Sequence, residues 1–170
     1  MSPPEPRGPG DAGPILHLVC GKIGSGKSTL AQRLAVTPST VLISEDVWLA
    51  RLYPGEISEI ADYVRCATRL RGALAEHLVA LLNAGISVVL DFPSNTVASR
   101  LWARSVFENA GAAHRLHFLD VGDELCKARL KARNEAGEHP FKATEAEFEV
   151  ISRYFEAPAL EEGFEVVRYE

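Results

Sequence analysis

Short apolar runs alternate along this chain with longer segments in which apolar residues recur at helical spacing. Five runs have the pattern of buried strands, and they cover Ile15–Cys20, Thr40–Ser44, Ile86–Leu90, His114–Asp120 and Phe164–Arg168. Helical patterns cover Thr29–Ala35, about Ile57–Asn83, Asn95–Glu108, Asp123–Asn134 and a last segment that begins at the capping box of Thr144 and Glu147. Strands that alternate with helices form βαβ units, so the pattern predicts an α/β fold of the P-loop type with about five mainly parallel strands flanked by helices.

The breaks between these elements follow from proline and glycine. Thr37-Pro38 and Gly85 are placed to end helices, and Pro54-Gly55 predicts a turn before the long helix. No internal repeat is visible. We therefore expect one domain over residues 15–170, preceded by a disordered Pro/Gly-rich tail over residues 1–14.

Composition narrows the class of protein. The 170 residues carry a formal net charge of −5, which argues against a dedicated nucleic-acid binder. Cys20, Cys66 and Cys126 are odd in number and widely spaced, so neither a disulfide framework nor a zinc pattern is indicated. No apolar run has membrane-spanning length, and the first residues lack the layout of a signal peptide. These features predict a cytoplasmic protein with reduced thiols and no membrane partner.

The run Gly21–Ser28 carries the most information about function. It matches the P-loop pattern G-x-x-x-x-G-K-S and lies between a predicted strand and a predicted helix. Such a loop wraps a phosphate in backbone N–H groups and directs a helix N-terminus at it, whereas the alternative is a glycine-rich turn with an unrelated lysine. The residues expected to bind ATP are Gly21, Gly24, Ser25, Gly26, Lys27, Ser28, Thr29, Arg129 and Arg133.

Three acidic residues follow predicted strands and are expected to face the nucleotide. In parallel sheets ligands bind beyond the carboxyl ends of the strands, where Glu45, Asp46 and Asp91 would lie. Asp91 ends an apolar run, as a Walker B carboxylate does, and is predicted to bind Mg²⁺ together with the hydroxyl of Ser28.

Asp46 is the best-placed general base for an alcohol held over the γ-phosphate, with Glu45 as the second choice. The alternative is that one of this acidic pair caps the following segment or only solvates a turn.

Arg129 and Arg133 are four residues apart on one predicted helix, so they share a face, and the Gly/Pro-containing loop of residues 134–142 follows. They could form a short lid that clamps phosphates and excludes water, with Arg133 in a catalytic role beside Lys27 and Asp46. The alternative is a solvated cationic face, because lysines flank them. The pairs Arg65/Arg69 and Arg100/Arg104 could receive an anionic substrate or form solvated stripes.

Other candidate residues carry less information about function. His114 and His117 are three apart in a strand, so they face opposite sides and cannot share a metal ion. Four aromatic residues are expected near the substrate rim or in the core, and these are Trp48, Tyr53, Phe92 and Trp102.

The chain resembles the small P-loop kinases often labelled AAA-family ATPases, a group close to chloramphenicol phosphotransferase and zeta toxins. The likeness covers nearly everything after the tail and rests on Gly21–Ser28, Ser44–Asp46, Val88–Asp91, Cys126–Asn134, Phe155–Pro158 and Glu162–Val167. It implies that Asp46 deprotonates the acceptor hydroxyl, that Lys27 and Ser28 act on phosphates and Mg²⁺, and that Arg129 and Arg133 form the lid. Asp91-Phe92-Pro93 is also similar to adenylate kinases, although Ser94 stands where they have arginine.

Together these features predict an ATP- and Mg²⁺-dependent kinase that phosphorylates a hydroxyl of a small molecule, such as an antibiotic, a sugar or a nucleoside-like compound. Two alternatives stay open. One is a kinase for nucleic-acid 5′ ends, which the acidity of the chain disfavours. The other is a nucleotide-binding switch or weak ATPase; a GTPase is disfavoured, because the chain has no Asn-Lys-x-Asp sequence.

Overall fold

The computed structural model describes residues 13–137 and 142–170. The predicted tail therefore lies outside the described residues except for Gly13 and Pro14, and so do residues 138–141 of the predicted lid loop.

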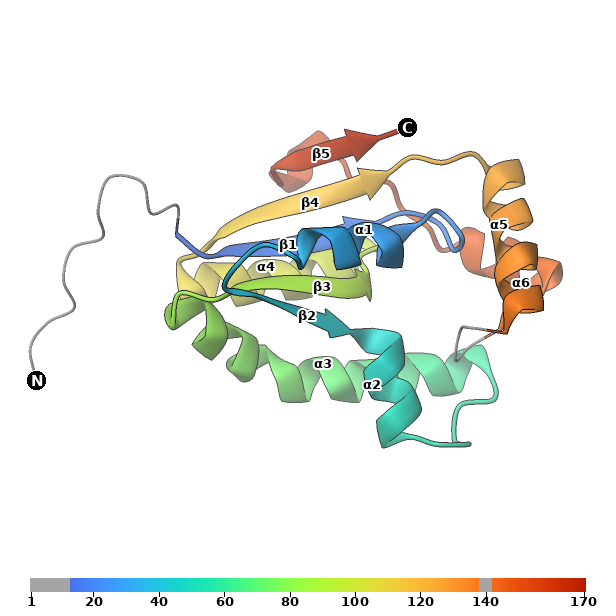
Figure 1. The fold of residues 1–170 in the computed structure, drawn as a ribbon, viewed down its shortest axis with the longest axis horizontal. Coiled ribbons are helices and arrows are strands. Elements are labelled where there is room, and N and C mark those ends of the chain that lie inside the picture. Colours follow the sequence, from blue (N-terminus) through green and yellow to red (C-terminus); the bar gives the residue numbers. More distant parts are fainter. Residues whose placement is uncertain (1–12, 138–141) are drawn as a thin grey trace, which may run out of the picture.

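One parallel sheet of five strands forms the centre of the molecule, in the order β2-β3-β1-β4-β5 (Figure 1). The strands are β1 (Ile15–Cys20), β2 (Thr40–Ser44), β3 (Ser87–Pro93), β4 (Ala113–Leu119) and β5 (Val166–Tyr169). The predicted α/β class with five parallel strands is confirmed.

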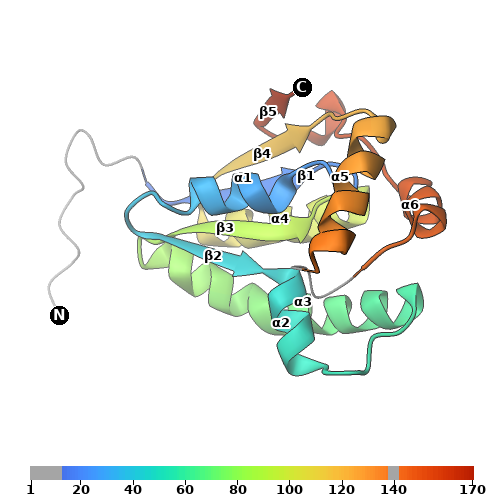
Figure 2. The same ribbon diagram turned by 45° about the vertical axis from the view of Figure 1, so that its right-hand side comes forward.

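Helices cover both faces of this sheet. They are α1 (Lys27–Leu34), α2 (Glu45–Leu52), α3 (Ile60–Asn83), α4 (Val97–Ala110), α5 (Asp123–Ala136) and α6 (Glu145–Ser152). Helices α3 and α4 lie along one face and α1 along the other, while α5 and α6 stand beyond the carboxyl ends of the strands (Figures 1 and 2). None of the helices in the described part of the chain is long and apolar enough to cross a membrane.

Both faces of β1 are buried. Leu16, Leu18 and Cys20 belong to the main core, which α3 and α4 share, whereas Val19 packs with Ala31 of α1 on the opposite face. A strand that is apolar on both faces is expected at the centre of a doubly covered parallel sheet. The loop that follows β1 is thus anchored to the most deeply buried strand.

The structure differs from the sequence prediction most between β2 and α3. Where only a turn was expected, Glu45 directly begins the eight-residue helix α2. Only Glu45 and Leu49 of α2 are buried, and two buried positions are too few to give a helical periodicity in the sequence. Helix α3 then begins at Ile60, because Glu59 and Asp62 form a capping box there. Strand β3 also runs on to Pro93, past the predicted end at Leu90.

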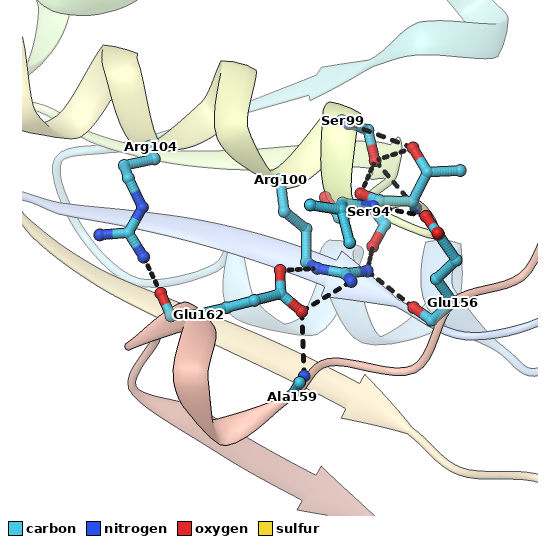
Figure 3. A network of polar contacts seen from close by, with 9 residues as sticks. Ser94, Ser99, Arg100, Arg104, Glu156, Ala159 and Glu162 are labelled. Atoms are coloured by element: carbon cyan, nitrogen blue, oxygen red, sulfur yellow. Dashed lines mark hydrogen bonds and ion pairs between the residues drawn. The ribbon is translucent and has the colours of Figure 1, made fainter.

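A buried arginine ties the C-terminal segment to α4 (Figure 3). The side chain of Arg100 is fully buried and donates from Nε and NH2 to the Glu162 carboxylate, at 2.6 and 2.8 Å. Its NH1 donates to the carbonyl oxygens of Ser94 and Glu156, at 3.1 and 2.8 Å. Arg104 donates to the carbonyl oxygen of Glu162. For Arg100 both interpretations from sequence are therefore wrong, because it is neither solvent-exposed nor available to a substrate, whereas Arg104 remains partly exposed beside Glu108.

A pair of histidines joins β1 to β4 on the face that α1 covers. His17 Nδ1 and His117 Nε2 are 3.1 Å apart, and His117 Nδ1 lies 2.9 Å from the hydroxyl of Tyr169. His114 instead stacks on Phe107 of α4. The prediction that His114 and His117 face opposite sides of the sheet is confirmed.

Replacing Glu162 with glutamine should destabilise the fold, because the fully buried Arg100 would lose its ionic partner. Breaking a buried ion pair from one side costs about 3–5 kcal/mol, so we expect Glu162→Gln to lower Tm by roughly 10 °C in a thermal melt. Glu161→Gln is the matched control, since that neighbouring side chain is exposed. Equal Tm values for the two variants would show that the ion pair contributes nothing to stability.

His117 should make the fold sensitive to acid. Burial, followed by the charges of His17 and Arg115, lowers the pKa of His117 from 6.5 to about 4. The unfolded chain therefore binds the proton more readily, so stability is lost as pH falls from 6.5 towards 4. In urea melts over that range, His117→Gln should lose less stability than the parent. The exposed His77 serves as control, and His77→Gln should follow the parent curve; parallel curves for all three proteins would contradict the prediction.

Candidate active site: a phosphate-binding loop ringed by carboxylates and arginines

The loop between β1 and α1 has a backbone that only glycines adopt easily. Gly24 and Gly26 have φ values of +80° and +100°. A Cβ atom at Gly24 would lie 2.4 Å from the carbonyl oxygen of Cys126 in α5, so a larger residue would collide with backbone. The Oγ atom of Ser25 is buried without a hydrogen-bond partner among the described residues. The loop thus brings backbone N–H groups and a buried hydroxyl to one place.

Asn95, which follows β3, fixes the start of this loop. The N–H of Gly21 donates to Asn95 Oδ1 at 2.9 Å, and Asn95 Nδ2 donates to the carbonyl oxygen of Gly21 at 2.8 Å. The carbonyl oxygen of Asn95 in turn accepts from the N–H of Glu156 at 2.9 Å. Sequence analysis did not find Asn95 as a site residue; its only sequence signal was its place just after an apolar strand that ends in Asp91-Phe92-Pro93.

Lys27 bends back over the loop. Its Nζ donates to the carbonyl oxygens of Gly21 and Lys22 at 2.7 and 2.9 Å. Burial lowers the pKa of Lys27 to about 8, and the charge of Asp91 is the largest influence that opposes this shift. The ammonium group is thus held inside the loop, where it can meet a phosphate oxygen.

Ser28 and Asp91 are brought together, although they are far apart in sequence. The hydroxyl of Ser28 donates to Asp91 Oδ1 at 3.1 Å. Burial raises the pKa of Asp91, against the hydrogen bond from Ser28, and the negative charge of Asp46 raises it further. A hydroxyl beside a carboxylate at the end of a parallel strand offers two oxygen ligands of the kind that Mg²⁺ takes.

The two acidic residues after β2 share one partner, the Tyr63 hydroxyl, but differ in their other contacts. Glu45 is fully buried and accepts hydrogen bonds from Arg71 Nε at 2.9 Å and from the Tyr63 hydroxyl at 2.8 Å. Burial raises the pKa of Glu45, and Arg71 and Tyr63 oppose the rise. Asp46 Oδ1 lies 3.2 Å from the same Tyr63 hydroxyl, and the negative charge of Asp46 acts on Lys27 as well as on Asp91.

The two arginines of α5 reach the site by different contacts. Arg129 NH1 donates to the carbonyl oxygen of Ser25 at 3.2 Å. Arg133 is half-buried, which lowers its pKa, and the charge of Asp46 opposes that shift. Its Nε is buried without a hydrogen-bond partner among the described residues. Arg129 thus contacts the loop although its side chain is exposed, whereas Arg133 is half-buried near Asp46.

Thr29 follows Ser28 in the first turn of α1, and the side chains of both residues are exposed. Other sequence candidates lie outside this arrangement, and among them Arg65 and Arg69 are exposed on α3. Phe92 and Trp102 stack on each other, with ring centres 5.9 Å apart, and line the core around Arg71.

The residues present fit a nucleotide and a divalent cation. The positive φ values of Gly24 and Gly26 allow the loop to present backbone N–H groups, and the buried Ser25 Oγ and Arg133 Nε are polar atoms suited to an added anionic ligand. Lys27 could hold phosphate, and Ser28 and Asp91 could hold Mg²⁺.

Solved structures of low sequence identity share this fold. A putative kinase from Chloroflexus aurantiacus J-10-fl has a TM-score of 0.72 and 19% identity, with 93% of this chain and 85% of that chain covered. Kti12 of Chaetomium thermophilum, in complex with ADP-AlF3, has a TM-score of 0.67 and 16% identity over 92% of this chain and 90% of that one. A sugar kinase from Janibacter sp. HTCC2649 has a TM-score of 0.63 and 20% identity, and the shares covered are 92% and 84%.

A comparison with the curated proteins gave no match. The model of one protein family, described as AAA domain, matches residues 16–158, which include the whole loop between β1 and α1, the acidic strand ends and both arginines of α5. With the sheet order and the loop geometry described above, this match shows that the chain belongs to the AAA domain family and has the fold of P-loop kinases.

Proposed function

We propose that this protein is an ATP- and Mg²⁺-dependent kinase that transfers the γ-phosphoryl group of ATP to a hydroxyl of a small molecule, such as an antibiotic, a sugar or a nucleoside-like compound. One observation carries the proposal: the Lys27 ammonium is held inside the glycine loop, next to the hydrogen-bonded pair of Ser28 and Asp91, and Asp46 is near enough for its charge to act on both Lys27 and Asp91. Asp46 has the chemistry of a general base. Its charge acts on Lys27, which fits a phosphate, on Asp91, which fits a metal ion, and on Arg133, which fits transition-state charge.

In the proposed reaction, Asp46 accepts the proton of the acceptor hydroxyl as its oxygen forms a bond to the γ-phosphorus. The bond from that phosphorus to the oxygen that bridges the β- and γ-phosphates breaks, and ADP leaves with the electron pair. Lys27 and the backbone N–H groups of the loop hold the phosphates, while Arg129 and Arg133 offset the charge that spreads over the transferring group. Bound Mg²⁺, held by Ser28 and Asp91, would supply further charge neutralisation.

The two carboxylates after β2 would then differ in role. Glu45 is enclosed by Arg71 and Tyr63, so it has no route to an acceptor without breaking its ion pair. Asp46 is the adjacent residue, about 100° around helix α2, and its charge acts on Lys27 and Asp91. This difference favours Asp46 over Glu45 as the base.

The direct test is to incubate the protein with γ-labelled ATP and Mg²⁺ and to follow the label. The acceptors are kanamycin, chloramphenicol, glucose, adenosine and a short oligonucleotide with a 5′ hydroxyl, each compared with water alone. Label on one of the small molecules supports the proposal. Label on the oligonucleotide alone would identify a 5′-end kinase, and label released only as phosphate would identify an ATPase or switch.

Nucleotide binding should depend on the glycine at position 24. In Gly24→Ala the new Cβ would meet the Cys126 carbonyl at 2.4 Å and the backbone would keep an unfavourable φ of +80°, so the loop must change shape. We expect ATP affinity, measured by calorimetric titration, to fall more than about tenfold, which is about 1.4 kcal/mol. Gly72→Ala is the control, because a Cβ at that exposed helical position meets nothing; equal affinities would refute the assignment of the loop.

Asp46 and Asp91 should give different kinetic defects. A positioned base contributes about 10²- to 10⁴-fold, so Asp46→Asn should lower kcat by that order while ATP affinity stays near that of the parent. Asp91→Asn should instead raise the Mg²⁺ concentration needed for half-maximal rate. The measurement is a steady-state Mg²⁺ titration of both variants. Unchanged kcat in Asp46→Asn would count against the hydroxyl-kinase mechanism.

A further inference from the structure

A tyrosine of α3 joins the two acidic residues that follow β2. The hydroxyl of Tyr63 lies 2.8 Å from Glu45 Oε1 and 3.2 Å from Asp46 Oδ1. Tyr63 is in the first turn of α3, whereas Glu45 and Asp46 are the first residues of α2, so this contact crosses between two helices. Sequence analysis gave Tyr63 no role.

The Glu45 side of this contact is fixed. Glu45 is fully buried, and the guanidinium of Arg71 donates to both of its oxygens, at 2.9 and 3.4 Å. That guanidinium itself packs beside the rings of Phe92 and Trp102, at 5.8 and 5.7 Å from the ring centres. Charge, burial and aromatic packing thus allow Glu45 little movement, and it provides a rigid anchor for the tyrosine hydroxyl.

The tyrosine has one proton to share between two carboxylates. Burial and the two neighbouring negative charges raise the pKa of Tyr63 well above its usual value of 10, so the hydroxyl keeps its proton. The hydroxyl is within donor distance of both carboxylates, and Glu45 is the nearer acceptor.

We propose that Tyr63 is a positioning residue for Asp46, which it holds between the anchored Glu45 and the phosphate-binding loop. This inference rests on the proposed kinase function. The hydroxyl can meet Asp46 in both of its states. While Asp46 is ionised, the Tyr63 proton is shared with it unequally. Once Asp46 has taken the proton of the acceptor hydroxyl, the new O–H can donate to the Tyr63 oxygen, and the Tyr63 proton stays with Glu45.

The test compares Tyr63→Phe with Tyr154→Phe, a control in which the tyrosine is 69% exposed. Transfer from γ-labelled ATP is measured to water and to kanamycin, chloramphenicol, glucose and adenosine. A carboxylate displaced by about 1 Å costs up to about 100-fold in rate. We therefore expect Tyr63→Phe to lower kcat roughly 10- to 100-fold with little change in the KM for ATP, and Tyr154→Phe to match the parent.

A double-variant cycle separates positioning from a general structural role. If Tyr63 acts through Asp46, adding Tyr63→Phe to Asp46→Asn should lower kcat no further, whereas a structural defect would multiply with the loss of the base. A further loss in the double variant, comparable to that of Tyr63→Phe alone, would overturn the inference.

Failure of the inference and failure of the proposed function give different results. Parent-like kcat in Tyr63→Phe together with a slow Asp46→Asn removes only the role of Tyr63. Parent-like kcat in Asp46→Asn removes the kinase mechanism itself. Where transfer is too slow to measure, a crystal structure of Tyr63→Phe decides: an Asp46 carboxylate that has moved or occupies several rotamers supports the inference, and an unchanged one refutes it.

Discussion

The close approach of the loop after β1 to its neighbours is the constraint on which the rest of the site depends. At Gly24 the backbone of α5 comes so near that no Cβ fits, and at Gly21 the side chain of Asn95 replaces the partners that a strand would have supplied. Because α5 carries Arg129 and Arg133, the same contact that excludes a side chain from the loop brings both arginines to it. A larger residue at position 24 would therefore disturb the loop and the arginines together.

The position of Asn95 links this loop to the far end of the chain. Arg100 donates to the carbonyl oxygens of Ser94 and Glu156 (Figure 3). The N–H of Glu156 in turn donates to the carbonyl oxygen of Asn95. A buried guanidinium with four hydrogen bonds costs desolvation free energy to form and is rigid once formed. Its stabilising contacts thus also fix the residue that orients Gly21, so stability and site geometry have a common origin in this part of the fold.

Features that depend on residues close together in the sequence could be predicted from the sequence. The strand order could not be read directly, but the P-loop, its flanking strand and helix, and the pairing of Ser28 with Asp91 follow from local motifs and from the rule that parallel strands end at one edge. The roles of Arg100 and Arg71 did not follow. Their partners, Glu162 and Glu45, are 62 and 26 residues away, and on a helical wheel a buried arginine looks the same as a solvated one. Helix α2 was missed because two buried positions in eight residues give too little periodicity.

The start of helix α2 gives different directions to the two carboxylates that follow β2, those of Glu45 and Asp46. Had Glu45 and Asp46 been in a turn, both could have reached solvent, and either could have served as base. Since the helix begins at Glu45, successive side chains diverge by about 100° around the axis. Glu45 enters the core, where Arg71 and Tyr63 must satisfy it. Asp46 contacts the Tyr63 hydroxyl, while its charge acts on Lys27, Asp91 and Arg133. The buried ion pair thereby keeps the start of α2 in place, which gives the second carboxylate a fixed direction that a flexible turn would not provide.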